Sequence, residues 1–170
     1  GHYNCPNNSH LGTLNTSATY PASLISDALT ILSANWLDSK SGGNFASRDA
    51  KSTTINAAII TGIVYSTGSG VNDFSGGVMN LPRLLEDWGN GSASIVLTLN
   101  TSIVNLFDSV QAVAQFKNPG VYYYAPTRQF SFDQNFRDYS KLPPGTPCLG
   151  VAYRSKWCVP PPGVTTYAGR

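Results

Sequence analysis

The residues of this chain whose types could support metal or acid–base chemistry are few and widely spaced. His2, Cys5 and His10 lie close together near the start. A structural metal site of these ligand types takes four ligands, and the fourth is missing here. Both histidines of the chain lie within these first ten residues, so the sequence gives no support for a Ser-His-Asp triad. We interpret this stretch as a polar segment without a metal.

Carboxylates are the groups that polysaccharide-active enzymes need, either as an acid–base pair or as calcium ligands beside a basic residue. The nine acidic residues are dispersed, and Asp133 and Asp138 are the close pair within an aromatic stretch. Arg83 and Glu86 are three residues apart, which is typical of an exposed ion pair. Motifs for phosphate, dinucleotide, zinc-protease and serine-hydrolase sites are absent from the sequence. We therefore expect no catalytic, cofactor-binding or metal-binding residue, and a β-helix polysaccharide hydrolase or lyase is the minor alternative.

Three cysteines are present, and two of them lie near the C-terminal end. Cys148 and Cys158 flank a short loop, and we expect them to form a disulfide that closes the Pro-rich tail. Cys5 is then left over, either as a free thiol or as a bond to another chain. A disulfide of this kind indicates an exported protein.

Eight of the nineteen aromatic residues lie between positions 116 and 139. Such rings pack in a core or a subunit interface, or they stack on sugar faces. We favour packing, and binding of surface glycans by this block is the alternative. The candidate interface residues are Tyr122, Tyr123, Tyr124, Phe130, Phe132 and Trp88.

One strand pattern occurs three times and would position these residues. Residues 97–107 align without gaps with residues 53–63 and with residues 29–39. Apolar residues alternate along each copy, which is the period of a β-strand. Starts at positions 29, 53 and 97 are compatible with stacked coils that carry one insertion. The sequence predicts a mainly β fold, a short right-handed parallel β-solenoid (β-helix), with three strands of an antiparallel sandwich as the alternative.

Stacking in register fixes which side chains point into the solenoid. Ile31, Ile55 and Leu99 are predicted to be buried, and Thr30, Thr54 and Thr98 to form a polar ladder outside. Asn56 and Asn100 are predicted to stack, with each amide able to bond the next.

The chain divides into a central domain and two arms. We expect an N-terminal arm at 1–27, a β-solenoid domain at 28–140 with a helical insertion at about 65–92, and a Pro-rich tail at 141–170. Within the insertion, residues 80–89 have the marks of a short helix: Asn80 as N-cap, proline in the first turn and glycine at the end. Its apolar stripe would be Leu81, Leu84, Leu85 and Trp88.

The composition indicates where the protein works. Only 12% of the residues are charged, about half the usual share, and the sequence is rich in Gly, Pro, Ser, Thr and Asn. The net charge of +2 comes without a basic cluster, which argues against nucleic acid. No apolar run reaches the length of a membrane helix. The chain begins at Gly1, and we interpret it as an exported and processed protein of the extracellular space or cell surface.

Several stretches, taken in order, carry a resemblance to a known family. They are NAAIITGIV, GGVMNLPRLLEDWG, LTLNTSIVNLF, YYAPTRQFSFDQNF and KLPPGTP, between residues 53 and 147. Together they resemble the C-terminal region of PilX-like proteins, exported bacterial proteins associated with type IV pilus assembly, whose chains read as β-solenoids. The resemblance implies a surface-associated structural role and supplies no catalytic residues. The hydrophobic pilin helix of that family has no counterpart in this sequence.

The expected function is structural. We predict a non-catalytic extracellular protein, a self-assembling filament or pilus-associated subunit whose partners are copies of itself, without cofactor. Because ordering 20 residues costs about 20 kcal/mol or more, the N-terminal arm is expected to order only by docking, either along its own solenoid or on a neighbouring copy, and we favour the neighbouring copy. Deleting residues 1–20 should then abolish polymerisation and leave a folded domain.

Overall fold

The computed structural model describes residues 2–63, 82–89, 94–106 and 123–146. Its strands are β1 (His2–Tyr3), β2 (Ser23–Ile25), β3 (Thr30–Ile31), β4 (Thr53–Thr61), β5 (Arg83–Leu84), β6 (Val96–Asn105) and β7 (Thr127–Phe132). Short 3-10 helices are η1 (Asn8–His10), η2 (Asp38–Lys40), η3 (Phe45–Ser47), η6 (Gln134–Arg137) and η7 (Tyr139–Lys141). In these ranges, no helix is long and apolar enough to cross a bilayer.

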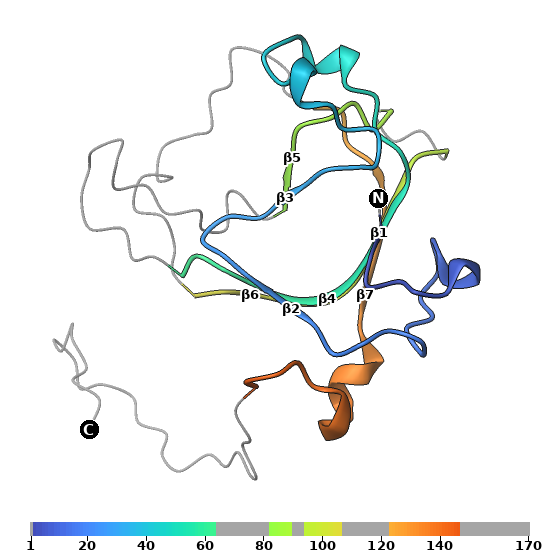
Figure 1. Cartoon of the computed structure of the whole chain (residues 1–170), viewed down its shortest axis with the longest axis vertical. Helices are drawn as coiled ribbons and strands as arrows, with labels where there is room; N and C mark the ends of the chain where they lie inside the picture. The colour runs from blue at the N-terminus through green and yellow to red at the C-terminus, as the bar shows by residue number, and fades with distance from the viewer. Residues whose placement is uncertain (1, 64–81, 90–93, 107–122, 147–170) are drawn as a thin grey trace, which may run out of the picture.

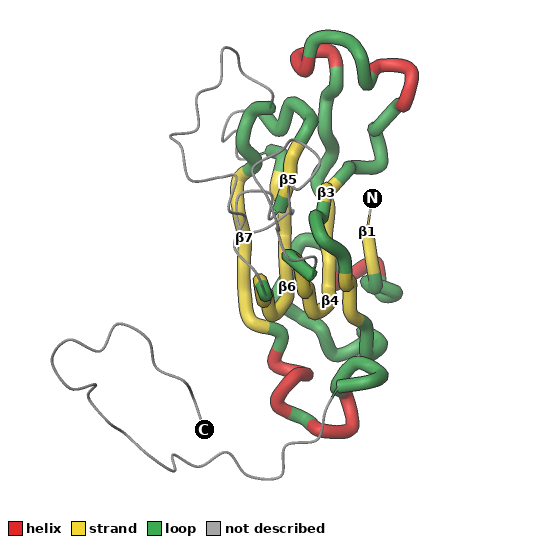
Figure 2. Tube along the Cα trace, turned by 90° about the vertical axis from the view of Figure 1, so that its left-hand side faces the viewer, coloured by secondary structure: helices red, strands yellow, loops and turns green. Residues whose placement is uncertain are grey.

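Two parallel sheets organise the molecule. β1, β2, β4, β6 and β7 form a five-stranded sheet, and β3 pairs with β5 in a two-stranded sheet. Along the large sheet the order is β7, β6, β4 and β1 (Figure 2). β2 pairs with the same edge of β4 as β1 does. The small sheet lies on one side of the large sheet, and the N-terminal segment lies on the other (Figure 1).

The pairing of β4 with β6 confirms one part of the repeat prediction. All nine residues of β4 pair with β6 in parallel, and the register includes Thr54 with Thr98, Ile55 with Leu99 and Asn56 with Asn100. This is the alignment that the sequence copies gave without gaps. The match follows from the period of two, because a slip of one residue would turn every apolar side chain away from the core.

The predicted β-solenoid is wrong: the described residues form a small parallel-sheet core. The first sequence copy does not stack on β4. Only Thr30 and Ile31 of it form a strand, and this strand pairs with β5. The chain turns directly afterwards, where the Trp36 N–H donates to the Ser33 carbonyl (3.2 Å). The edge of β4 that the first copy was expected to fill holds β1 and β2 instead.

The predicted helix at residues 80–89 is also wrong in its described part, residues 82–89. Arg83 and Leu84 form strand β5, and Asp87 makes parallel bridges to Asp49 and Tyr124. Leu84, Glu86 and Trp88 are buried, which is the period of a strand. Leu84 and Trp88 fit a helical stripe and a strand equally well, so only the tertiary position of Glu86 distinguishes the two.

The core lies between the two sheets. Its buried members are Ile31, Ala50, Ile55, Ala57, Leu84, Trp88, Leu97 and Leu99. The prediction that Ile31, Ile55 and Leu99 are buried is thus confirmed. Trp88 is 0% exposed, so its assignment to an interface is wrong: its ring fills the core opposite the large sheet.

The N-terminal segment, residues 4–22, docks on the outer face of its own sheet. The Gly12 N–H donates to Thr54 Oγ1 (2.8 Å), and Asn100 Nδ2 donates to the Thr13 carbonyl (3.0 Å). Thr54 and Thr98 are therefore buried, not an exposed polar ladder, while Thr30 is exposed. Docking on a neighbouring copy was predicted, but the segment finds its hydrogen-bond partners within the chain.

Asparagine side chains join this segment to the sheet. Asn4, in the left-handed region at φ 54°, donates from Nδ2 to the carbonyls of Tyr20 (2.6 Å) and Asn56 (2.8 Å). Asn100 Nδ2 donates to Asn56 Oδ1 (2.8 Å), which confirms the predicted asparagine stack. The amides thus provide partners for the backbone carbonyls of Asn56 in β4 and of Thr13 and Tyr20 in the segment.

Candidate functional site

The two outer edges of the large sheet are the first feature of interest. On β7, the N–H of Thr127 donates to the Ile95 carbonyl (3.1 Å), and the N–H of Asp133 donates to the Thr101 carbonyl (3.3 Å). Backbone groups alternate in direction along a strand. The N–H and C=O groups of Arg128, Phe130 and Phe132 therefore point away from β6, at the end of the strand order in the described ranges.

The side chains of Phe130 and Phe132 are large and incompletely covered. They are 46% and 44% exposed. Phe130 pairs with Leu99 of the core, so both rings project from the core face of the sheet. Phe132 makes an edge-to-face contact with Phe136 (6.0 Å between centroids), and the Arg137 guanidinium lies 5.9 Å from its ring centroid.

The opposite edge is built by β2 and β1. The Ala58 N–H donates to the Ala22 carbonyl, and the Ser26 N–H donates to the Ile60 carbonyl (3.0 Å each). By the same alternation, the backbone groups of Ser23 and Ile25 point away from β4. Ile25 is 59% exposed. The sheet therefore ends in two edges of different length and sequence, and all its strands run in the same direction.

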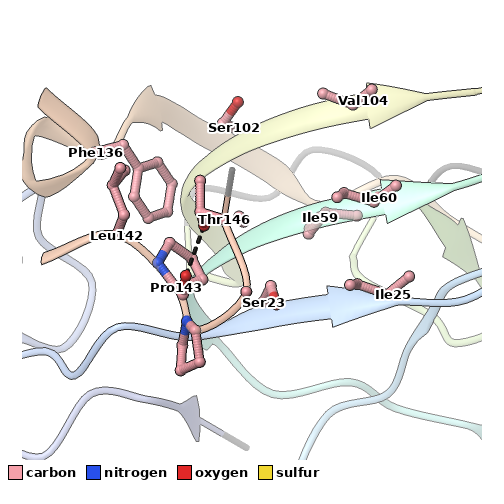
Figure 3. A pocket seen from close by; sticks show the side chains of 13 residues that line it. Ser23, Ile25, Ile59, Ile60, Ser102, Val104, Phe136, Leu142, Pro143 and Thr146 are labelled. Atoms are coloured by element: carbon pink, nitrogen blue, oxygen red, sulfur yellow. Dashed lines mark hydrogen bonds between the residues drawn. The ribbon is translucent and has the colours of Figure 1, made fainter. Parts of the chain in front are cut away.

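A groove opens on the outer face near the carboxyl ends of β2, β4 and β6 (Figure 3). Its volume is about 260 Å³. The floor carries Ile25, Ile60 and Val104, which lie in one row across the sheet. Figure 3 shows Phe136, Leu142 and Pro143 as the facing wall. The lining is mainly apolar, and its volume suits one or two apolar side chains better than a large ligand.

That wall is held in place by a turn. The Thr146 hydroxyl donates to the Pro143 carbonyl (2.6 Å), and the Thr146 N–H donates to the same carbonyl (3.1 Å). Gly145 has a φ of 82°, in the left-handed region that glycine adopts without strain. The Leu-Pro-Pro-Gly-Thr sequence at residues 142–146 therefore favours this turn.

A second, more polar hollow of about 240 Å³ lies at the start of β4, β6 and β7. Thr54 and Gln129 line it together with His2. The Thr54 N–H donates to His2 Nδ1 (3.3 Å), so this nitrogen must carry no proton. Desolvation against the sheet, and then nearby positive charge including Lys51, lowers the pKa of His2. The neutral imidazole thus joins β1 to β4.

The two acidic residues of the aromatic stretch, Asp133 and Asp138, serve local structure. Buried Asp133 accepts from the Thr16 hydroxyl (2.7 Å) and from the Asn135 N–H (2.9 Å), capping η6. Asp138 caps η7, and its bonds from the Ser140 hydroxyl and N–H lower its pKa. The close pair predicted from sequence is therefore two consecutive helix caps.

The predicted exposed ion pair of Arg83 with Glu86 is wrong. Glu86 is 0% exposed and accepts from the Ser33 N–H (2.6 Å) and the Ser33 hydroxyl (2.7 Å), whereas Arg83 is exposed. Two charge-assisted bonds of this kind offset part of the cost of burying a carboxylate. They fasten the chain after β3 to the chain after β5.

The candidate metal ligands do not converge on a site. His10 lies at hydrogen-bonding distance from Asn15 (3.1 Å) and Asn7 (3.4 Å). Cys5 is a free thiol, and burial raises its pKa. Within the part of the chain that the structure describes, no group of three His, Cys, Asp or Glu side chains could hold a metal ion.

The remaining candidates separate into different places. Tyr122, Cys148 and Cys158 lie outside the described residues. Tyr123 and Tyr124 are exposed, and Tyr124 packs edge-to-face on Phe45 (5.0 Å). Phe130 and Phe132 lie instead on β7, so the described aromatic residues of the block lie at separate places.

Sequence reasoning missed the edge formed by β2 and the groove. The only local signal for β2 is the three-residue sequence SLI, which is too short to show the two-residue period of a strand. The row of Ile25, Ile60 and Val104 depends on pairing between strands that are distant in sequence.

Comparison with protein-family models, curated proteins and solved structures finds no match for this chain. The resemblance to PilX-like proteins therefore stays a prediction.

Proposed function

We propose that this chain is a non-catalytic structural protein of the extracellular space or cell surface that assembles with copies of itself, as a filament or pilus-associated subunit. The observation that carries the proposal is the pair of unlike edges of one parallel sheet, β7 on one side and β1 with β2 on the other. A contact between unlike surfaces repeats from copy to copy, and it gives a ring or an open filament.

Two further observations support the proposal. Natural proteins usually protect a sheet edge with charge, proline or a cover, yet β7 presents Phe130 and Phe132 beside Arg128 as its one charged residue. Five of the seven acidic side chains in the described ranges accept hydrogen bonds that hold local structure: Asp38, Glu86, Asp87, Asp133 and Asp138. A recognition surface is thus better supported than a catalytic one.

The test is the assembly state of the purified full chain. Sedimentation velocity over a wide range of concentration should show species that grow with concentration, and negative-stain electron microscopy should show filaments or rings. A chain that stays monomeric at its highest soluble concentration would overturn the proposal. Sedimentation that shows a dimer as the largest species would also contradict the proposal, because contacts between unlike surfaces continue to the next copy.

Export is tested separately. The low share of charged residues and the predicted pair of Cys148 and Cys158 support an oxidising compartment. Peptide mass spectrometry without reduction should find these two cysteines linked. Finding both as free thiols in native material would contradict the extracellular assignment.

Glycan binding is the second candidate, and one observation favours it. Tyr123 and Tyr124 are consecutive in sequence and both exposed, and Tyr124 packs edge-to-face on Phe45. Aromatic faces of this kind stack on sugar rings. Calorimetry against a panel of surface oligosaccharides should then show binding that Tyr124→Ala abolishes and Tyr139→Ala, at an exposed position elsewhere, preserves. No binding in the panel would exclude this candidate.

A further inference from the structure

We infer that the contact between copies is parallel strand addition, in which β7 of one copy pairs with the edge formed by β1 and β2 of the next. The inference rests on the proposed function and names the partner surface. β7 offers the outward backbone groups of Arg128, Phe130 and Phe132, and β2 offers those of Ser23 and Ile25. An isolated outward row of this kind is a template for another strand.

The direction of the strands selects this pairing. All strands of the large sheet are parallel, so placing β2 of one copy beside β7 of another continues the same ladder and the same twist. Pairing β7 with a second β7 about a two-fold axis would be antiparallel, and it would leave the β1 and β2 edge without a partner. Head-to-tail addition satisfies both edges.

The side chains agree with this choice. Leu24 pairs with Ile59 and packs against the core, so it projects from the core face of the sheet. Phe130 pairs with Leu99 and projects from the same face. In the extended sheet, Leu24 of one copy would therefore cover a Phe ring of its neighbour. Shifting the register of β2 against β7 by one residue would move Leu24 and the Phe rings to opposite faces, whereas a shift of two residues would keep them on the same face.

The outward backbone groups of β7 have few competing partners in the described ranges. Ser131 Oγ makes a long contact with the Phe132 carbonyl (3.4 Å). The backbone groups of Phe130 lie between this carbonyl and those of Arg128, at the centre of the edge. Phe130 is therefore the position at which the added strand is most easily blocked.

Proline substitution tests the contact without breaking the sheet. Proline removes an N–H and is tolerated on an edge strand when that N–H points outward. Phe130→Pro should block the β7 edge, and Ile25→Pro should block the opposite edge. Phe130→Ala, which keeps the N–H, and Leu32→Pro, at an exposed position away from both edges, are the controls. Circular dichroism melts establish that each variant is folded, and Arg128→Pro replaces Phe130→Pro if that variant does not fold.

Mixing the two blocked variants gives the decisive measurement. Each alone should sediment as a monomer, because each lacks one of the two surfaces. An equal mixture should form a dimer and nothing larger, since the β2 edge of the Phe130→Pro chain can still take β7 of the Ile25→Pro chain. The Phe130→Ala chain should still polymerise, with weaker affinity.

Other outcomes overturn the inference. If Ile25→Pro alone forms a dimer that Phe130→Pro cannot form, β7 pairs with β7. If Phe130→Pro lowers the melting temperature of a monomeric chain and leaves assembly unchanged, a segment of the same chain covers this edge. Polymers of wild type that both proline variants still form would exclude strand addition and leave the proposed function standing, whereas a monomeric wild type would exclude both.

Discussion

At the scale of single residues, polar side chains make long-range links that local patterns do not indicate. Glu86 reaches Ser33, 53 positions earlier, and Thr16 reaches Asp133, 117 positions later. The first bond continues the pairing of β3 with β5 two residues further along both segments, and the second joins the N-terminal segment to the residue that follows β7. A buried carboxylate of this kind depends on its donors, since losing one leaves a desolvated charge with less compensation.

Ser33→Ala should therefore lower the free energy of unfolding by about 1–3 kcal/mol, because the hydroxyl donor to buried Glu86 is lost. Urea titration followed by circular dichroism measures the change. Ser39→Ala, at an exposed position in η2, is the control and should change the midpoint little. Equal midpoints for the two variants would show that the Glu86 carboxylate does not depend on Ser33.

His2 should make the attachment of β1 depend on pH. Its pKa is lowered in the folded chain from the ordinary value of 6.5, so the unfolded state binds the proton more tightly. The stabilisation that neutral His2 gives to the folded chain is thus fully present above pH 6.5, and it is lost as the pH falls through the lowered pKa of the folded state. The protection factor of the Thr54 amide, corrected for intrinsic exchange, should fall over that window. In His2→Gln the protection should not depend on pH there; an unchanged profile would mean that the imidazole does not hold this amide.

At the scale of elements, β4 and β6 are the rigid centre of the fold. Their nine-residue ladder carries core residues on one face and the covered polar row on the other. β1, β2 and β7 are short by comparison, and each has one partner strand in the described ranges. Stability is therefore expected to be concentrated in the β4–β6 pair, and the edges should open first.

Substitutions along β6 should show this division. Leu99→Ala should lower the free energy of unfolding by about 2–5 kcal/mol, because Leu99 is fully buried and truncation leaves a cavity. Ile103→Ala is the matched control on the same strand and face, since Ile103 is exposed, and it should cost less than about 1 kcal/mol. Chemical denaturation of both variants checks the difference. Similar losses in the free energy of unfolding for the two variants would show that Leu99 is not part of the core.

At the scale of the whole molecule, the N-terminal segment completes the fold of its own chain. It covers the outer face of β4 and β6, and it reaches the end of β7 through Thr16 and Asn135 (2.8 Å from Asn135 Nδ2 to the Thr16 carbonyl). The ordering cost that suggested a neighbouring copy is offset within the chain by these bonds and by burial of Thr54 and Asn100.

Deleting residues 1–20 should therefore destabilise the monomer. The links that Gly12, Thr13 and Thr16 make to Thr54, Asn100 and Asp133 would be lost, together with the pairing of β1 with β4 and the bonds between Asn4 and Asn56. At about 1 kcal/mol for each hydrogen bond, the first three links alone should lower the free energy of unfolding by about 3 kcal/mol, so the total loss should be larger. Thermal unfolding of the truncated chain measures this loss. A truncated chain as stable as the full one would mean that the segment contributes little to the fold.

The sequence by itself determined the central ladder. Alternation of apolar residues identified β4 and β6 as strands, and the gapless alignment gave their register, because register and face are fixed together when the period is two. The same pattern placed Ile31, Ile55 and Leu99 in the core.

Only the tertiary structure decided which strands are neighbours. β3 lies in a copy of the sequence pattern that β4 and β6 share, yet it pairs with β5. The two-residue β1 and the three-residue β2 pair with the free edge of β4 instead. The helical stripe at residues 80–89 failed for a related reason, since Leu84 and Trp88 satisfy either period until Ser33 provides a partner for Glu86. Pairing depends on contacts between segments 35 to 53 residues apart, and no short window of sequence contains both partners.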